Sequence, residues 1–184
     1  MIDNALNVLV SELNNFFRIK YQLSEDIIIL SNIVNSSGEN TYKDENKLIV
    51  SLINIEEEKI IQKANGNHKN APLYINIYIL ISTSFNEKLI NEALKFLSSV
   101  IAFFQSKRKF TNTNTASLSS NIDKLLVDIH NLNTNDLSNV YSYLGTKYTP
   151  SIAYKVSMLI IEEEVMTYKL PEITGRETDS DIKR

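Results

Sequence analysis

The chain has 184 residues, a length that suits one domain or one domain with a short tail. It is 43% hydrophobic and 22% charged with a net charge of −3, so it can build a core and lacks the basic excess that binding to nucleic acid needs. The sequence contains no cysteine, which excludes disulfides, thiolate zinc sites and thiol nucleophiles.

The N-terminal residues and the most apolar helical run indicate neither a leader nor a membrane span. MIDNALNVLVSELNNFF (1–17) carries Asp3 and Glu12 and lacks the basic n-region and small-residue cleavage site of a secretory signal. FLSSVIAFF (96–104) is interrupted by serines and falls well short of the roughly 20 residues that cross a bilayer. We expect a protein that is made in the cytoplasm and stays there, without direct membrane insertion.

Apolar residues at helical spacing predict a first helix over residues 3–20, with Asp3 as its N-cap. The apolar stripe consists of Leu6, Leu9, Val10, Leu13, Phe16 and Phe17. Two strands are expected next. DIIILSNIV (26–34) is rich in β-branched residues, and KLIVSLINIEEEKI (47–60) is apolar on both faces in its first half, as expected inside a sheet.

The clearest strand is LYINIYILIS (73–82), which alternates between two faces. Leu73, Ile75, Ile77, Ile79 and Ile81 share the face expected to pack on a core, and Tyr74, Asn76, Tyr78 and Ser82 share a face expected to be half wet. Ser84 and Glu87 have the spacing of a capping box, which predicts a helix over 85–106. Its expected buried stripe is Leu89, Ile90, Ala93, Leu94, Leu97, Val100, Ile101 and Phe104.

The remaining elements follow a polar interval. TNTNTASLSS (111–120) is a low-complexity loop with little reason to be rigid on its own. KLLVDIHNL (124–132) predicts a strand, and NTNDLSNVYSYLG (133–145) predicts a short helix ending at Gly145. SIAYKVSMLIIEEEVMTYKL (151–170) predicts a long last strand. One of its faces carries Ile152, Tyr154, Val156, Met158 and Ile160.

The element order α-β-β-β-α-β-α-β predicts an α+β fold with a mixed, largely antiparallel sheet flanked by helices. We expect one domain over residues 1–170. From Pro171 the sequence PEITGRETDSDIKR has no apolar period, so residues 171–184 are expected to form a flexible C-terminal arm.

Three consecutive glutamates, Glu56, Glu57 and Glu58, close the strand at 47–60, and Glu162–Glu164 repeat the pattern later in the chain. One interpretation is a site for a hard divalent metal, which prefers oxygen ligands. Consecutive strand residues point to alternate faces, however, so one run cannot converge on one ion, and a site would need glutamates from both runs. The favoured interpretation is a solvated strand end that can also serve as an acidic rim against a basic neighbour.

The basic counterpart is SKRKF (106–110), in which Lys107, Arg108 and Lys109 follow the second helix. Cations at a helix C-terminus are favoured by its dipole, so ordinary capping electrostatics can explain this block. The functional alternative is a patch that meets an acidic patch on another copy, because rings of identical subunits use heterologous contacts.

Other candidate chemistry is weak. His130 shares a strand face with Asp128, but no nucleophile motif accompanies the pair, and His68 lies in a polar loop. The sequence has no phosphate-binding glycine loop and no zinc-binding histidine motif. Tyr74 and Tyr78 could stack bases, but the net acidity favours strand packing or a protein interface. We therefore expect no enzyme activity, no cofactor and no metal.

Five segments, in order, resemble one protein family. They are MIDNALNVLVSELN, ENKLIVSLINIEEEK (45–59), PLYINIYILISTSF (72–85), ALKFLSSVIAFFQSKRKFT (93–111) and LGTKYTPSIAYKVSMLIIEE (144–163). The family is the tube-cap or tail-terminator proteins of contractile injection systems, the phage-tail-like particles of the antifeeding-prophage and virulence-cassette type and their type VI secretion-like relatives. The resemblance runs from about residue 1 to residue 170.

The resemblance implies a tail-terminator fold and a structural role. It implies a hexameric ring on the distal end of the inner tube, which stops tube polymerisation and helps to anchor the last sheath ring. The implied partners are further copies of the chain, the inner-tube protein and the sheath protein. Glu56–Glu58 and Lys107–Lys109 would then belong to an assembly interface, and the arm from residue 171 would reach toward the sheath.

Two alternatives to a cap remain open on the sequence alone. One is an enzyme that uses carboxylates from both glutamate runs with a divalent metal. The other is a monomeric adaptor that binds a partner protein through an edge of its sheet.

Overall fold

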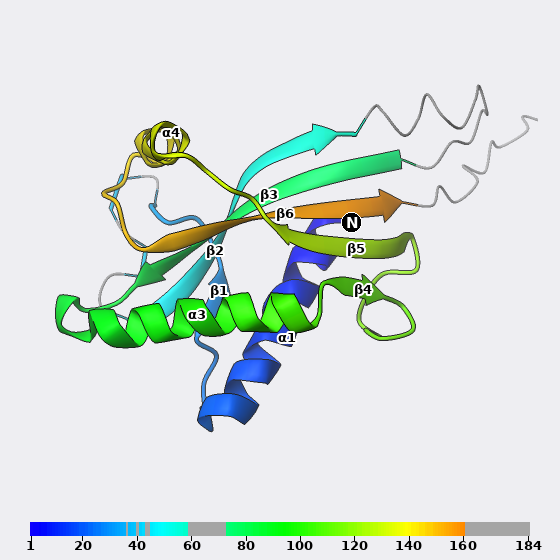
Figure 1. Cartoon of the computed structure of the whole chain (residues 1–184), viewed down its shortest axis with the longest axis horizontal. Coiled ribbons are helices and arrows are strands. Elements are labelled where there is room, and N and C mark those ends of the chain that lie inside the picture. The colour runs from blue at the N-terminus through cyan, green and yellow to red at the C-terminus, as the bar shows by residue number, and fades with distance from the viewer. Residues whose placement is uncertain (36, 40, 43–44, 59–72, 161–184) are drawn as a thin grey trace, which may run out of the picture.

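The computed structural model describes residues 1–35, 37–39, 41–42, 45–58 and 73–160, which pack around one sheet (Figure 1). The helices are α1 (Ile2–Tyr21), α3 (Ile90–Ser106) and α4 (Thr134–Leu144), with a 3-10 turn, η1 (Glu87–Leu89), before α3. The strands are β1 (Ile28–Leu30), β2 (Lys47–Glu57), β3 (Leu73–Ser84), β4 (Lys109–Thr111), β5 (Ile122–Ile129) and β6 (Ser151–Ile160). None of the helices described is long and apolar enough to cross a membrane.

The strands form a six-stranded sheet in the order β1-β2-β3-β6-β5-β4. β1 runs parallel to β2, and the other neighbouring strands are antiparallel. The predicted α+β fold with a mixed, largely antiparallel sheet flanked by helices is therefore confirmed. The prediction missed β4, because a strand of three residues is too short for an alternation pattern to be recognised.

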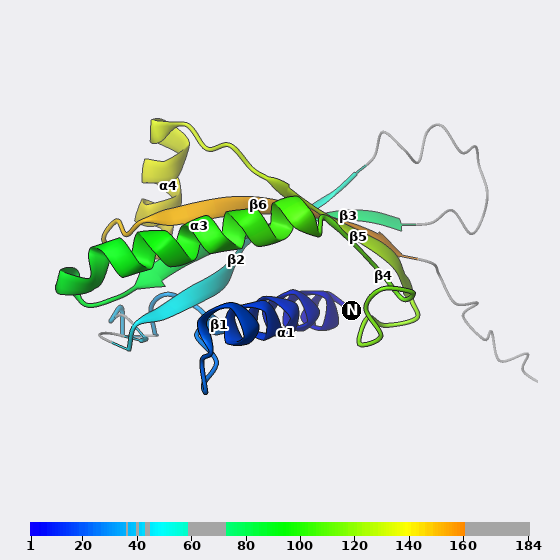
Figure 2. The ribbon, with the colours of Figure 1, turned by 60° about the horizontal axis from the view of Figure 1, so that its bottom comes forward.

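Helices α1 and α3 cover one face of the sheet, and α4 lies on the other (Figure 2). The larger core joins α1 and α3 to the face of β3 that carries Ile77, Ile79 and Ile81, as the alternation predicted. The smaller core lies beneath α4 around Leu80 and Tyr141. The second face of β3 is thus not half wet along its whole length, because α4 covers it at Leu80.

The stripe predicted for the first helix is confirmed. Leu9, Leu13 and Phe17 are at most 1% exposed, and Phe17 meets Phe96 of α3 in an edge-to-face contact with ring centroids 5.5 Å apart. The predicted cap is wrong. α1 begins at Ile2, so Asp3 lies in its first turn, where its carboxylate pairs with the N-terminal amine at 2.7 Å.

The start of the second helix also differs from the prediction. Ser84 still belongs to β3, and its hydroxyl donates a hydrogen bond to the carbonyl of Tyr42. The cap is Asn86, whose side chain accepts a hydrogen bond from the backbone N–H of Lys88 at 3.1 Å. The side-chain oxygen of an Asn N-cap accepts a backbone N–H of the first turn, as the hydroxyl of a Ser N-cap does in a capping box.

The buried face of α3 is rotated relative to the predicted stripe. Three members of that stripe are exposed: Ile90 by 44%, Leu94 by 46% and Ile101 by 37%. The helix packs instead through a face that carries several aromatic rings. The buried residues of α3 are Ala93, Phe96, Leu97, Ser99, Val100, Phe103 and Phe104.

The loop at 111–120 is held by more contacts than its composition predicts. The side chain of Asn4 on α1 donates to the carbonyl of Ser117 and accepts from the N–H of Ser119. Thr115 and Leu118 are 3% and 5% exposed. Polar residues can anchor a loop when their hydrogen bonds reach a neighbouring element, which local composition does not reveal.

The short helix behaves as predicted, and the neighbouring strands differ in length. Asn133 caps α4 through bonds to two backbone N–H groups, and Gly145 ends it with φ 67°. The strand expected at 26–34 is limited to β1. The second half of the strand predicted at 151–170, Glu162–Glu164, His68 and the arm at 171–184 lie outside the described residues.

Candidate assembly interface

The three glutamates divide between the two faces of the sheet at the end of β2. A bulge between Leu52 and Asn54 inserts Ile53, after which Glu56 pairs with Asn76 and Glu57 with Ile75 on β3. Glu56 and Glu58 contact side chains on the α4 side of β3, and Glu57, one residue apart from each, belongs to the opposite face. The expectation that the run cannot converge on one ion follows from this alternation.

Glu56 is held by neutral donors. Its Oε2 accepts a hydrogen bond from the hydroxyl of Tyr78 at 2.9 Å, and its Oε1 accepts one from the side-chain amide of Asn54 at 2.9 Å. No Lys or Arg within the described ranges forms an ion pair with Glu56. Partial burial, the hydrogen bond to Glu56 and the charges of Glu56 and Glu58 raise the pKa of Tyr78.

Glu58 belongs to a second polar group on the same face. Its Oε2 accepts from the side-chain amide of Asn76 at 2.9 Å, and the ammonium of Lys155 on β6 lies 3.8 Å away. The hydroxyl of Ser157 donates to the side-chain amide oxygen of Asn76 at 2.8 Å. Glu58 therefore has a cation beside it, whereas Glu56 has none in the described part of the chain.

A groove lies between α4 and the sheet beside Glu56. Its volume is about 560 Å³. Apolar walls come from Ile53, Leu132 and Val140, and Tyr143 of α4, which is 84% exposed, stands at its border. The floor carries Tyr78, whose ring meets His130 with centroids 4.8 Å apart. The groove is thus a partly apolar recess that contains the carboxylate of Glu56, which has no ion-pair partner in the described part of the chain.

The basic block lies at the opposite edge of the sheet, and two of its three cations are already paired. The ammonium of Lys107 lies 2.7 Å from a carboxylate oxygen of Glu12 on α1 and 4.9 Å from the ring centroid of Phe110. Arg108 forms an ion pair with Asp128 of β5. Both residues thus form ion pairs within the chain, with partners that the expected helix-dipole electrostatics did not identify.

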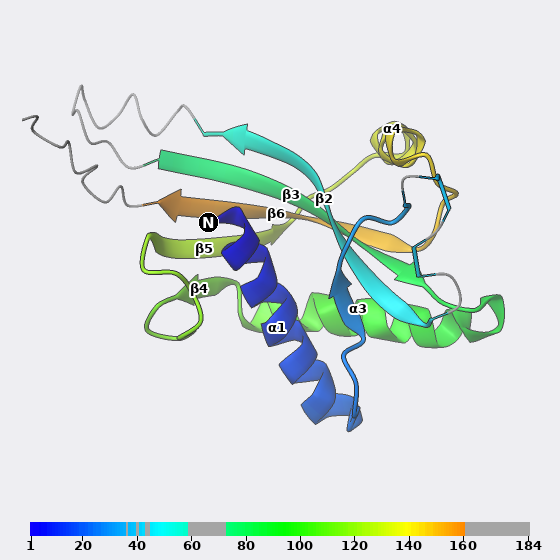
Figure 3. The same ribbon diagram turned by 180° about the vertical axis from the view of Figure 1, so that it is seen from behind.

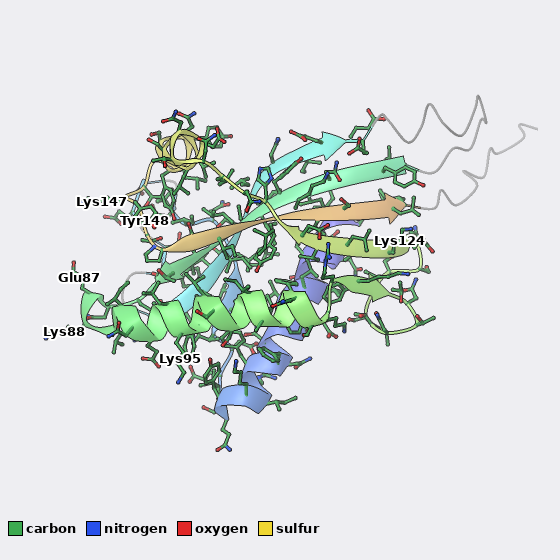
Figure 4. All side chains as sticks on the ribbon, viewed as in Figure 1. Glu87, Lys88, Lys95, Lys124, Lys147 and Tyr148 are labelled. Carbon is green, nitrogen blue, oxygen red and sulfur yellow. The ribbon has the colours of Figure 1, made fainter. Side chains whose placement is uncertain are left out.

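Two lysines at this edge have no ion-pair partner within the described ranges. Lys109 lies on β4 and is exposed, and Lys124 lies near the start of β5 (Figure 4). Lys124 pairs across the sheet with Leu159, whose other neighbour is Tyr74. Lys124 therefore lies at the same end of the sheet as the glutamates but near the other edge. Glu56 and Glu58 therefore form no ion pair with the basic block at 107–109 or with Lys124 in the described part of the chain.

Asparagine side chains close two outer edges of the sheet. Asn14 of α1 is 5% exposed; its amide donates to the carbonyl of Ile28 at 2.8 Å and accepts from the N–H of Ile28 at 3.0 Å. Asn114 does the same for β4, accepting from the N–H of Thr111 at 2.9 Å and donating to the carbonyl of Lys109 at 3.0 Å. Each amide occupies the place that a further strand would take.

The outer side of β2 is different. β1 accompanies β2 only as far as the pair Leu30 and Val50, and from Leu52 to Glu57 no described strand lies on the side of β2 that faces away from β3 (Figure 3). Leu52 is 38% exposed and Ile55 is 44% exposed along this stretch. Among the residues that the structure describes, this part of β2 is an open sheet edge next to the groove.

The catalytic interpretations gain nothing from the described geometry. Asp128 pairs with Arg108, whereas His130 contacts Tyr78, so these two side chains do not form a base-and-orienter pair. No cluster of three or more His, Asp or Glu residues that could hold a metal occurs in the described part of the chain. A metal site shared with Glu162–Glu164 involves residues outside it.

Sequence reasoning missed the sealing asparagines, the open edge of β2, the groove and Lys124. One signal was present for Asn14. It is a polar residue between Leu13 and Phe17 on the apolar side of the first predicted helix, and such a residue requires a buried hydrogen-bond partner. No local pattern marks Asn114, because its role depends on the return of β4 along β5.

Comparison with known proteins agrees with the resemblance seen in the sequence. The sequence profile of the family described as Pvc16 N-terminal domain matches residues 4–174. No curated protein matches the chain in sequence.

Two solved structures share the fold. One is the PVC sheath/tube terminator of an extracellular contractile injection system in the extended state, with a TM-score of 0.60, 14% identity and coverage of 100% of this chain and 64% of that chain. The other is the tube terminating cap of the anti-feeding prophage, with a TM-score of 0.55, 17% identity and coverage of 99% and 60%. The chain spans less than two thirds of the length of either neighbour.

Proposed function

The chain belongs to the Pvc16 N-terminal domain family, and from this membership we propose that it is a structural cap on the inner tube of a contractile injection system. The family match over residues 4–174 carries the proposal. The two structural neighbours, described as a sheath/tube terminator and a tube terminating cap, support it through their shared fold.

In the proposed mechanism the cap works by geometry and not by catalysis. Copies of the chain form a hexameric ring that docks on the last layer of the tube and offers no surface for a further layer. The ring also helps to anchor the last sheath ring. Sealing of the β1 and β4 edges by Asn14 and Asn114 supports this role, because sealed edges do not extend by strand pairing.

We further propose that the acidic end of β2 is an assembly contact. Glu56 supports this, because its charge faces neutral donors in the described structure and gains from a basic neighbour. On the basic side, Lys109 and Lys124 replace Lys107 and Arg108 as the residues available to an acidic neighbour, since the latter two are paired within the chain. Residues 171–184 would form an arm toward the sheath.

The capping role is tested by deletion of the chain from a strain that makes the particles. Electron microscopy should then show tubes of abnormal length or without a stable distal end, and expression of the wild-type chain should restore the normal length. Labelled chain should be found at the distal end of intact particles assembled in the cytoplasm. Normal particles without the chain, or label elsewhere, would contradict the proposal.

The charged contacts are tested separately in the same complementation assay. Glu56→Lys and Lys109→Glu should each reduce the fraction of capped tubes, and Glu39→Lys, which changes an exposed glutamate outside β2, is the matched control. Lys109→Glu is cleaner than Arg108→Glu, because the latter also breaks the ion pair with Asp128. If both variants cap normally, the charge contact is wrong and the capping role is unaffected.

A further inference from the structure

We propose that the open edge of β2, with the groove beside α4, is a docking site for an extended basic segment of another protein, which adds to the sheet as a further strand. The inference deepens the acidic contact within the proposed function and rests on the premise that this end of β2 faces a partner. It names the partner's chemistry and the atoms that recognise it.

The backbone of β2 is positioned to receive a strand. The N–H of Ser31 donates to the carbonyl of Val50, and the N–H of Glu58 donates to the carbonyl of Tyr74 on β3. Backbone groups alternate in direction along a strand, and the bulge at Ile53 resets that alternation. The groups of Leu52 and Ile55 therefore point to the outer side, where no described strand lies.

The outer N–H of Ile55 has a replaceable partner. It donates to the side-chain oxygen of Asn54, its own neighbour in sequence, at 2.9 Å. The side-chain nitrogen of Asn54 donates to Glu56 and not to the backbone. Asn54 therefore forms one hydrogen bond to the backbone of this edge, whereas Asn14 and Asn114 each form at least two to the edges that they seal. An incoming carbonyl can take over the bond to Ile55 without exposing a buried group.

The side chains around the edge specify what the added strand must carry. The bulge turns Ile53 and Asn54 toward the α4 side, so an added strand places alternate side chains over the groove. Ile53 and Val140 suit an apolar side chain, and Glu56 and the exposed ring of Tyr143, which both line the groove, suit a Lys or Arg. The open stretch takes a segment of about six residues at roughly 3.3 Å each.

A second copy of the chain is a poorer occupant than another protein. Pairing through β1 or β4 would require Asn14 or Asn114 to leave its backbone partners. Pairing of the open stretch of β2, from Leu52 to Glu57, with the same stretch of a second copy would bring further glutamates to the contact and no Lys or Arg. The described strands of the chain thus lack the basic, open partner that the site requires.

The test uses the full chain and a short synthetic peptide, acetyl-TVTKTVTRT-amide, with a fluorescent label; one face of this peptide carries both valine and basic side chains, as the groove requires. Anisotropy should show saturable binding to the wild-type chain. Two peptide controls separate the contributions: N-methylation of alternate residues removes the backbone bonds but keeps the charges, and replacement of Lys and Arg by Glu reverses the charge. Neither control peptide should bind.

Variants of the chain locate the site. Ile55→Pro removes the outer N–H and should weaken binding by roughly tenfold or more, whereas Ile55→Val keeps the N–H and should bind normally. Glu56→Gln keeps a hydrogen-bond acceptor and should weaken binding by roughly threefold to tenfold. Asn54→Ala frees the N–H of Ile55 and should strengthen binding.

Hydrogen exchange keeps the test decisive if Ile55→Pro does not fold, because peptide binding should slow exchange of the Ile55 amide in the wild-type chain. Equal binding of the N-methylated peptide, unchanged exchange at Ile55, or no binding would overturn the inference. If the wild-type chain caps tubes but gives one of these results, the docking site is wrong and the proposed capping function stands. If the chain binds the peptide as expected but never caps tubes, the capping function is wrong and the docking site stands.

Discussion

The β4 edge and the β2 edge of the same sheet end in different ways. Beyond β4, Asn114 satisfies both a backbone donor and a backbone acceptor, and Thr115 donates a further bond to the carbonyl of Thr111. Beyond β2, one bond from the N–H of Ile55 to Asn54 covers the outer side. The comparison shows that a single amide can replace a missing strand only when it reaches both groups of the edge.

The largest loss of stability is expected when the asparagine that seals the β1 edge is removed. Asn14→Ala removes hydrogen bonds to the N–H groups of Ile27 and Ile28 and to the carbonyl of Ile28 in a buried setting. We expect the free energy of unfolding to fall by about 3 kcal/mol, because unsatisfied buried backbone groups each cost about 1–3 kcal/mol. Chemical denaturation at equilibrium measures this loss.

The control for Asn14 is Asn4→Ala on the same helix. Asn4 also bonds to two backbone groups, of Ser117 and Ser119, but in a more exposed setting. Its loss should cost less than about 1 kcal/mol, since water can replace the bonds. Equal losses for the two variants would show that burial of the hydrogen bonds does not determine how much they contribute to the free energy of unfolding.

A smaller effect is expected at β4. Asn114→Ala should lower the free energy of unfolding by about 1 kcal/mol at most, because both backbone groups left without partners are exposed and water can replace the bonds. The same variant should open the β4 edge and cause concentration-dependent association in sedimentation velocity. Asn112→Ala, which removes one bond to the carbonyl of Ile122, should keep the association state of the wild-type chain in the same experiment.

How far the sequence predicts this molecule depends on the range of the interactions involved. Alternation and helical spacing identified the larger core correctly, since period alone decides which side of β3 carries Ile77 and Ile79. The exposure of Leu94 and the sealing by Asn114 could not be read in this way. Both depend on which distant segment packs against the residue, and that information is absent from a local window.

The candidate site was predicted as residue types and not as geometry. The alternation rule alone correctly separates Glu57 from Glu56 and Glu58. The ion pair between Lys107 and Glu12 joins the residue that follows α3 to a residue of α1, so no spacing rule reveals it. The assembly role of both charged blocks remains a prediction.

The division between structural and available cations gives a third prediction. Lys107→Met should lower the free energy of unfolding by about 1 kcal/mol, because the ion pair with Glu12 is half-buried and charge-assisted. Lys109→Met should change it little, since Lys109 is exposed and forms no ion pair in the described structure. Thermal unfolding of both variants at one salt concentration tests the difference. A larger loss for Lys109 would reverse the assignment.

The smallest effect concerns Tyr78 beside the open edge. Burial is the largest cause of its raised pKa, followed by the hydrogen bond to Glu56 and the charges of Glu56 and Glu58. An acid whose pKa is higher in the folded state stabilises that state below its unfolded pKa, about 10 for tyrosine, and loses this contribution as the pH rises through the folded value. Wild-type stability should therefore fall more steeply above about pH 10 than that of Tyr78→Phe.

Glu56→Gln separates the causes of the Tyr78 shift, because it removes the neighbouring charge and keeps an acceptor for the hydroxyl. Tyrosinate absorbance, measured as the difference between chains with and without Tyr78, should give a pKa that is lower than in the wild type but still above the ordinary value, since burial remains. A return to the ordinary value would make charge, and not burial, the main cause. The edge of β2 would then be more open to water than its neighbours in the sheet imply.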